Sequence, residues 1–207
     1  MPTPEVHAYV RAALPPPPAK VLEIGAGSGE LAEQLRESGY DVTAIDPAGG
    51  PGIVQIHLHE IDGSFDAAVA IVSLHHVEPL AASFERLAGV LAPGARLVVD
   101  EFDVARYDEA AARWWLGYAD HEHDPADLVG DLRHHLHPVD AITAALAPWF
   151  DVGEPIRGAY LHRWEIDPGL RGEEENEIAA GRIPATGARF IATRASRAPG
   201  APPPPPA

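Results

Sequence analysis

Cysteine is absent from the 207-residue sequence, and lysine occurs once, at Lys20. Without a thiol the chain forms no disulfide bond, no thiolate metal site and no cysteine nucleophile. Arginine therefore supplies almost all of the basic content, which is 15 residues against 31 acidic ones. The arginines are scattered singly along the chain, so the sequence predicts no basic patch.

Positive charge is scarce as well, since the formal net charge is −16 at pH 7. A surface this acidic repels a phosphate backbone, so we expect no nucleic-acid partner. Apolar runs fall short of the ~18 residues that a membrane span requires. The amino terminus also lacks the basic stretch and apolar run of a signal peptide. We therefore expect a soluble cytoplasmic protein, and the sequence leaves its oligomeric state open.

What the sequence does contain is an alternation of short apolar runs with amphipathic segments. The predicted strands are "KVLEIG", "DVTAID", "GIVQIHL", "FDAAVAIVSL" and "RLVVDEF", with helices over "GELAEQLRES" and "PLAASFERLAGVL". Two further strands are expected around "FDVGEPIRGAYLHRW" and "GARFIATRA". Strands and helices that alternate at this spacing are typical of βαβ units. The pattern therefore predicts an α/β fold with a doubly wound, mostly parallel sheet.

Residues 1–197 are predicted to form one domain. A lid over the sheet would comprise about residues 1–14, 104–148 and 165–187. Within it, "EEENE" at 173–177 is expected to be the solvated face of a short helix. The proline-rich segment 198–207 cannot bury apolar area, so we expect it to be disordered.

The stretch "VLEIGAGSGEL" at 21–31 places three glycines directly after a predicted strand. A dinucleotide fingerprint needs a glycine where Glu30 stands, and the Lys-Ser or Lys-Thr pair of a phosphate-binding loop is missing. Glu23 inside the motif would repel a pyrophosphate but would suit a cationic amino group. Amide donors at the start of the following helix would suit a carboxylate. The turn therefore favours an amino-acid nucleoside with a zwitterionic end.

Residues 19–102 resemble the class I S-adenosylmethionine-dependent methyltransferases, in particular the group that modifies small molecules. Four motifs carry the resemblance in the family's order: "VLEIGAGSGEL", "VTAIDPA", "GSFDAAVAIVSLHHV" and "FERLAGVLAPGARLVV". The resemblance implies S-adenosylmethionine as the cofactor. It also implies a Rossmann-like, mostly parallel seven-stranded sheet with helices on both faces and a helical lid insertion.

The resemblance and the chemistry of the residues together predict the cofactor site. Asp46 lies 21 positions after Gly25, near the ~20-residue spacing at which a strand-end carboxylate meets a ribose. An ordinary turn residue before Pro47 is the alternative. Either His57–Leu58 or Glu60 would hold the adenine end. The full predicted cofactor set is Glu23, Gly25, Ala26, Gly27, Gly29, Asp46, Pro47, His57, Leu58 and Ile71.

Methyl transfer from a sulfonium requires alignment of the acceptor more than covalent chemistry by the protein. A general base helps when the acceptor is a phenol or an alcohol. His76 and Glu101 follow the fourth and fifth predicted strands, and we predict them as catalytic residues, with a structural role as the alternative for each. The expected reaction is O-methylation of a small-molecule acceptor.

Other functions remain open at this stage. The chain could bind S-adenosylmethionine without transferring a methyl group, as a cyclisation catalyst or a pseudo-enzyme. An NAD-linked reductase is a distant third possibility, which Glu30 disfavours. A nucleic-acid methyltransferase is disfavoured by the charge and by "SLHH", which stands where such enzymes carry an N/D-P-P-Y tetrapeptide.

The predicted lid is rich in histidine and aromatic residues. Five histidines fall between residues 121 and 137 beside several acids, a composition that suits zinc or non-haem iron. A polar lid surface explains the same residues, and we predict no metal site. The aromatic residues either line an acceptor pocket or form the core of the lid; they are Trp114, Trp115, Tyr118, Trp149, Tyr160 and Trp164.

Overall fold

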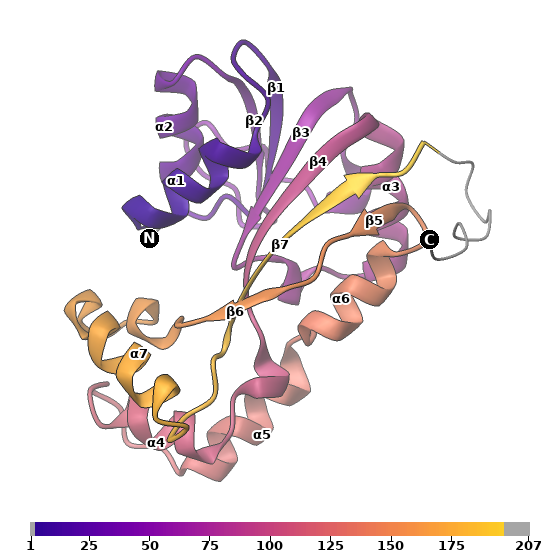
Figure 1. Ribbon diagram of the computed structural model, residues 1–207. Helices are drawn as coiled ribbons and strands as arrows, with labels where there is room; N and C mark the ends of the chain where they lie inside the picture. The colour runs from indigo at the N-terminus through magenta and orange to yellow at the C-terminus, as the bar shows by residue number, and fades with distance from the viewer. Residues whose placement is uncertain (1–2, 197–207) are drawn as a thin grey trace.

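The strands of the computed structural model, whose described residues are 3–196, form one seven-stranded sheet (Figure 1). The strands are β1 (Lys20–Ile24), β2 (Asp41–Ile45), β3 (Phe65–Ile71), β4 (Leu91–Phe102), β5 (Phe150–Val152), β6 (Ile156–Gly158) and β7 (Gly187–Arg194). Their order is β2-β1-β3-β4-β7-β5, and β6 also pairs with β7. Only β7 runs antiparallel to its neighbours. The predicted α/β class with a mostly parallel sheet is confirmed. The expected disorder of residues 198–207 lies outside the described residues.

Helices cover both faces of the sheet, as the apolar central strands require. The helices are α1 (Pro4–Ala13), α2 (Glu30–Glu37), α3 (Leu80–Val90), α4 (Glu109–Leu116), α5 (Pro125–His135), α6 (Val139–Leu146) and α7 (Arg171–Ala179). One face packs against α1 and α2 through residues such as Val10 and Leu35. The other packs against α3 and α6 through Phe84, Leu87 and Ile142. None of these helices in residues 3–196 is long and apolar enough to cross a membrane.

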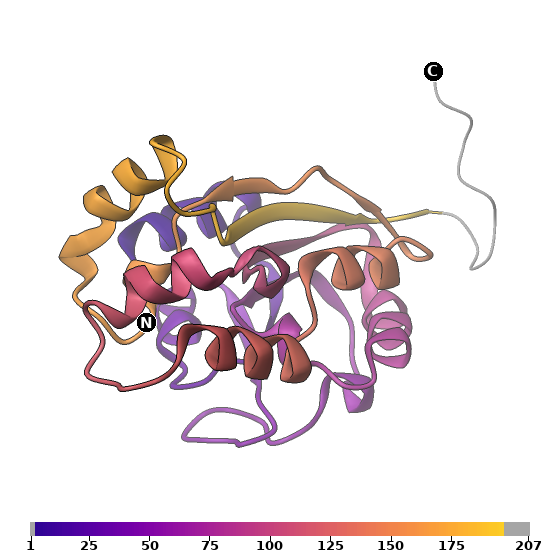
Figure 2. The same cartoon turned by 90° about the horizontal axis from the view of Figure 1, so that it is seen from below.

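The lid gathers at the carboxyl ends of the parallel strands, where α4, α5 and α7 lie together (Figures 1 and 2). Short 3-10 turns link the elements: η1 (Leu58–Glu60) lies between β2 and β3, η2 (Leu74–His76) between β3 and α3, η3 (Val104–Arg106) between β4 and α4, and η4 (Leu161–Arg163) and η5 (Pro168–Leu170) between β6 and α7. The core of the lid is aromatic, with the Trp115 and Trp164 rings 4.4 Å apart and the Phe102 and Tyr160 rings 4.9 Å apart. Most of the lid aromatics therefore serve packing, and Tyr160 also borders a cavity.

The third predicted strand, "GIVQIHL", is wrong. The structure forms only two isolated bridges there, between Ile45 and Val54 and between Gly50 and Ile53. After these bridges the segment leaves the edge of the sheet and continues into η1. His57 and Leu58 therefore line a cavity and do not pair with a neighbouring strand. The fourth and fifth predicted strands are consequently β3 and β4. The sheet still has the expected seven strands, because residues 150–164 form two short strands, β5 and β6, where one was predicted.

Two of the segments expected in the lid pack elsewhere. Helix α1 lies on the sheet, and α6, within the predicted 104–148 lid, lies on the opposite face. Their inward residues explain this, since Val6, Val10 and Ile142 are fully buried against strands. Residues of segment 165–187, such as Ile166 and Ile183, pack in one cluster with residues of α4 and α5.

Candidate cofactor and active site

The glycine turn between β1 and α2 is tied to the ends of two neighbouring strands. Gly25 has φ +68°, and a Cβ there would lie 2.3 Å from Cβ of Ser73. The Ser73 hydroxyl donates a 2.7 Å hydrogen bond to the Ile24 carbonyl. On the other side, the Gly27 amide donates to Oδ2 of Asp46 at 2.9 Å. Only a residue without a side chain fits at Gly25, which explains the first glycine of the motif.

A cavity of about 420 Å³ lies on one side of this turn. Asp46 and Pro47 line it after β2, and His57 and Leu58 line it from the segment that was expected to be a strand. Glu60 does not reach in, because its Oε2 accepts a 2.7 Å hydrogen bond from the His57 amide. Of the residues predicted for the adenine end, His57 and Leu58 line the cavity and Glu60 does not.

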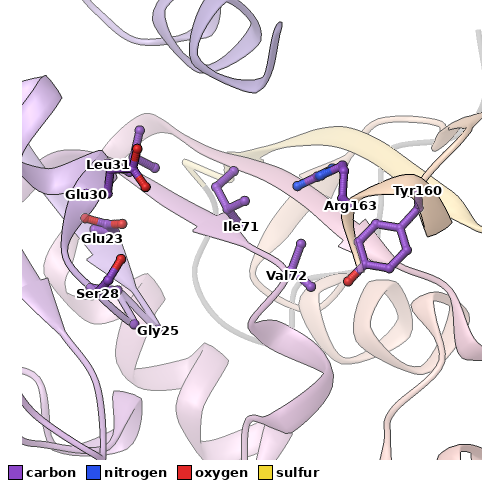
Figure 3. A pocket seen from close by; sticks show the side chains of 11 residues that line it. Glu23, Gly25, Ser28, Glu30, Leu31, Ile71, Val72, Tyr160 and Arg163 are labelled. Carbon is purple, nitrogen blue, oxygen red and sulfur yellow. The ribbon is translucent and has the colours of Figure 1, made fainter. Parts of the chain in front are cut away.

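A second cavity, of about 260 Å³, lies on the other side of the turn, and it shares Gly25, Gly27 and Val72 with the first (Figure 3). Glu23 lies on one side of this cavity and Arg163 on the other, with the guanidinium pointing toward Ile71. The two cavities thus form one bent site around the glycine turn. The larger arm is lined mainly by apolar residues and includes the Asp46 carboxylate. The smaller arm carries charges of both signs, at Glu23 and Arg163.

Glu23 is buried without full hydrogen bonding. Its residue is 4% exposed, and Oε2 has no hydrogen-bond partner among residues 3–196. Burial raises the pKa of this carboxyl to about 7, although the nearby Arg36 guanidinium opposes the shift. A buried carboxyl left partly unsatisfied on a cavity wall is suited to a cationic ligand group. The residues of this arm therefore fit the ammonium of the expected cofactor.

Val72 separates the two arms and has φ +53°. A β-branched residue rarely adopts the left-handed region, and such strain is concentrated at functional sites. The Val72 amide is held by a 2.7 Å hydrogen bond to the Asp100 carbonyl of β4. The strained backbone turns the chain from β3 into η2 at the point where the arms meet.

Glu101 lines neither arm and is fully buried. Oε2 accepts from the amides of Ser73 and Leu74 at 3.1 and 2.8 Å. Oε1 accepts from the Phe102 amide at 2.8 Å and lies 2.5 Å from Nδ1 of His75. This geometry favours a positioning role over the catalytic role that the sequence suggested, because a carboxylate engaged in this way holds η2 and does not face the reacting atoms.

His76 does lie on the wall of the larger arm and is exposed. Its ring lies 4.2 Å from that of His75, centroid to centroid. Partial burial lowers the pKa of His76, and the neighbouring His75 and His137 act in the same direction against Glu101. The ring is thus neutral near pH 7 and able to accept a proton.

Most of the predicted site residues are brought together by the fold. Glu23, Gly25, Ala26, Gly27 and Ile71 line the smaller arm, and Gly25, Gly27, Asp46, Pro47, His57, Leu58 and His76 line the larger one. Gly29 lines neither; it precedes α2 with φ +79°. Lining residues outside the predicted cofactor and catalytic sets include Ser28, Glu30, Val72, Ser73 and Arg163, and Tyr160, one of the lid aromatics, lines the smaller arm. No local pattern marks Arg163, which reaches the site only through the folding of the lid.

The histidine-rich segment is spread over the lid surface. His121 stacks on Trp115, and Nε2 of His137 lies 2.7 Å from Oε1 of Glu78. Among residues 3–196 no three histidine, aspartate or glutamate side chains are grouped so that they could hold a metal ion.

The chain is similar in sequence to known methyltransferases. The family model of the methyltransferase domain matches residues 5–140. A ubiquinone biosynthesis O-methyltransferase of Xanthomonas axonopodis pv. citri is 34% identical over 110 residues, which are 43% of this chain and 45% of that protein. The protein of the same name from Xylella fastidiosa is 29% identical over 174 residues, 68% of this chain and 70% of that one. The match thus spans less than half the length of the Xanthomonas relative.

A solved structure shows the same fold. The S-adenosylmethionine-dependent methyltransferase of Mesorhizobium loti superposes with a TM-score of 0.61 at 21% identity, over 92% of this chain and 97% of that one. At this identity the likeness concerns the fold alone.

The contact at Gly25 predicts a steep cost for a methyl group. We expect Gly25→Ala to lower the free energy of unfolding by about 3 kcal/mol or more, from left-handed strain and the clash with Ser73. Gly27→Ala is the matched control, because its φ is +53° but a Cβ there meets nothing within 4 Å. It should lose about 1 kcal/mol. Urea unfolding followed by circular dichroism measures both, and equal losses would contradict the contact.

The raised pKa of Glu23 predicts a pH-dependent instability. The carboxyl titrates near 4.5 in the unfolded chain and near 7 in the folded one. Ionisation therefore favours unfolding as the pH rises through this window. Glu23→Gln, which cannot ionise, should be more stable than wild type by roughly 3 kcal/mol at pH 8 and by little at pH 4. Thermal unfolding at the two pH values tests this, and a difference independent of pH would contradict it.

Proposed function

Since the chain belongs to the class I S-adenosylmethionine-dependent methyltransferases, we propose that it transfers the methyl group to an oxygen atom of a small-molecule acceptor. The observation that carries the proposal is the bent site around the glycine turn. Its larger arm has the size and lining of a nucleoside site, and its smaller arm carries opposite charges. That combination matches the adenosine and the zwitterionic amino-acid end of the cofactor.

Each part of the cofactor has a proposed partner in this chain. Asp46 would accept from the ribose hydroxyls with the lone pairs that its bonds to Gly27 and Ala48 leave free. Pro47 and Leu58 would contact the adenine from the apolar wall. Glu23 would receive the ammonium, which supplies the hydrogen bonds that Oε2 lacks. The same carboxyl would repel a pyrophosphate, which argues against a dinucleotide in this site.

The choice of an oxygen acceptor rests on two supports. The Xanthomonas and Xylella relatives are both named ubiquinone biosynthesis O-methyltransferases. In addition, a neutral histidine on the cavity wall, His76, provides the base that a phenol or alcohol needs and that a carboxylate acceptor does not. The net charge of −16 makes a nucleic-acid acceptor a poor fit to this proposal.

The proposed mechanism assigns orientation and proton transfer to the protein. S-adenosylmethionine supplies a methyl group already activated on a sulfonium. The chain would hold the acceptor oxygen in line with that methyl group. His76 takes the acceptor's proton, and Glu101 keeps η2 in place by holding the backbone of Ser73 and Leu74.

The ribose contact predicts a loss of affinity in Asp46→Ala. We expect S-adenosylhomocysteine to bind wild type with micromolar affinity and the variant at least about tenfold more weakly, a change of about 1.4 kcal/mol. Asp46→Asn, which keeps one acceptor oxygen, should lose less. Isothermal titration calorimetry with NADH as the competing candidate provides the measurement. Binding of NADH in place of the thioether would overturn the cofactor assignment.

The base assignment predicts a change in turnover. With 3,4-dihydroxybenzoate as a first phenolic acceptor, His76→Ala should lower kcat by about 10² or more. Because the lowered pKa keeps the ring neutral, the wild-type rate should be constant from pH 7 to 8 and should fall only at a pH below the ~6.5 at which an ordinary histidine titrates.

His134→Ala is the control for this experiment, since His134 lies exposed on α5 away from both arms. Equal kcat in His76→Ala and wild type would remove His76 from the mechanism. Cofactor binding with no turnover on any phenol or alcohol, while an amine acceptor is methylated, would replace the oxygen acceptor by a nitrogen one.

A further inference from the structure

Two buried glutamates of this fold hold 3-10 turns in the same manner. Glu101 holds η2, as described above. Glu174 of α7 holds η4: its Oε1 accepts from the amides of Tyr160 and Leu161 at 2.7 and 2.9 Å. Its Oε2 accepts from the His162 amide at 2.9 Å and lies 2.7 Å from Nδ1 of the same residue. Each carboxylate thus binds consecutive amides and the histidine ring of one turn.

Glu174 departs from the sequence expectation for "EEENE". The neighbours Glu173 and Glu175 are exposed, but Glu174 is fully buried. Burial acts to raise its pKa, yet the hydrogen bonds from the His162 ring and the three amides outweigh it and hold the pKa below its ordinary value. A carboxylate that stays ionised in this position fixes the backbone of η4 against α7.

The turn that Glu174 holds ends at Arg163, on the wall of the smaller arm (Figure 3). The Arg163 side chain is 7% exposed, and its Nη1 donates to Oδ1 of Asp100 at 2.8 Å. The guanidinium also lies 5.3 Å from the centroid of the Tyr160 ring. Two contacts therefore orient a guanidinium that has five N–H donors in all.

Asp100 does not cancel the charge of Arg163, because it is shared. Its Oδ2 also accepts from Nε of Arg189 at 2.7 Å. Across the smaller arm stands Glu23, whose Oε2 lacks a partner among residues 3–196. The arm therefore presents one cationic and one anionic wall to a ligand with an ammonium and a carboxylate.

We propose that Arg163 binds the α-carboxylate of the cofactor's methionine moiety, and that Glu174 is the positioning residue that holds Arg163 there. The inference rests on the proposed function. It replaces the sequence expectation that amides at the start of α2 bind this carboxylate. The first turn of α2 carries Glu30 and Glu33, and Glu30 lines the arm itself, so an anion there meets like charge. A buried guanidinium offers a paired, charge-assisted contact instead.

The test compares two ligands that differ only at the amino-acid end. S-adenosylhomocysteine carries the ammonium and the carboxylate, whereas 5′-methylthioadenosine lacks both and keeps the nucleoside. Isothermal titration calorimetry gives the ratio of their affinities for each variant. Arg163→Gln should weaken S-adenosylhomocysteine at least about tenfold and leave 5′-methylthioadenosine within twofold. Arg163→Lys keeps the charge without the planar fork, so its affinity for S-adenosylhomocysteine should lie between those of wild type and Arg163→Gln.

Glu174→Gln tests the positioning role. A glutamine offers one acceptor oxygen and places an NH₂ group against amide donors, so η4 should shift. The affinity for S-adenosylhomocysteine relative to 5′-methylthioadenosine should then fall as it does in Arg163→Gln. Glu173→Gln is the matched control: the same change on the same helix at an exposed side chain that bonds the Tyr118 hydroxyl. It should leave the ratio unchanged. Circular dichroism verifies that each variant is folded.

The outcomes separate the inference from its premise. An Arg163→Gln variant with the wild-type ratio would overturn the carboxylate contact while leaving the cofactor assignment intact. A folded Glu174→Gln variant with the wild-type ratio would overturn the positioning role alone. Wild type that binds neither nucleoside would overturn the proposed function and this inference with it. A Glu174→Gln variant that does not fold leaves Arg163→Gln to decide the carboxylate contact and assigns Glu174 to stability.

Discussion

The close approach of β1 and β3 at Gly25 and Ser73 is the contact on which the site depends. It brings the glycine turn against the strand end that carries Val72, so that both arms open from one point. Glu101 stabilises this contact, because its carboxylate accepts hydrogen bonds from the amides of Ser73 and Leu74. A side chain at Gly25 would separate the strands, and a missing carboxylate at Glu101 would release η2. The shape of the site thus follows from backbone contacts more than from the side chains on its walls.

The smaller arm of the site contains charges of both signs. The molecule has a large excess of acid, yet the smaller arm places a cation at Arg163 opposite Glu23. Ionised Glu23 costs stability because it is buried with an unsatisfied oxygen. That cost is typical of a binding site in which the ligand supplies the missing partner. Arg163, by contrast, is already paired with Asp100 and is oriented before any ligand arrives.

The sequence predicted the parts of this site that depend on local chemistry. Gly25 and Glu23 belong to one contiguous motif, and Asp46 lies at the spacing set by one βα unit, so all three could be placed without a structure. Arg163 and Glu174 could not, because their roles depend on how the lid folds over the sheet. The helix pattern of "EEENE" also gives no sign of which glutamate turns inward. The predicted strand at "GIVQIHL" was wrong for a related reason. Its apolar residues line a cavity and enter η1, and the apolar pattern of such a segment is the same as that of a strand.

Just before its last residue, strand β4 carries two acidic residues in succession, Asp100 and Glu101, and successive side chains of a strand point to opposite faces. Asp100 accordingly meets Arg163 and Arg189 on one side, while Glu101 meets η2 on the other. One strand end therefore supports both arms at once. An insertion or deletion of a single residue in β4 would exchange these faces and remove both supports together. In evolutionary terms, length variation should be confined to segments such as the glycine-rich loop 49–52 and excluded from this strand.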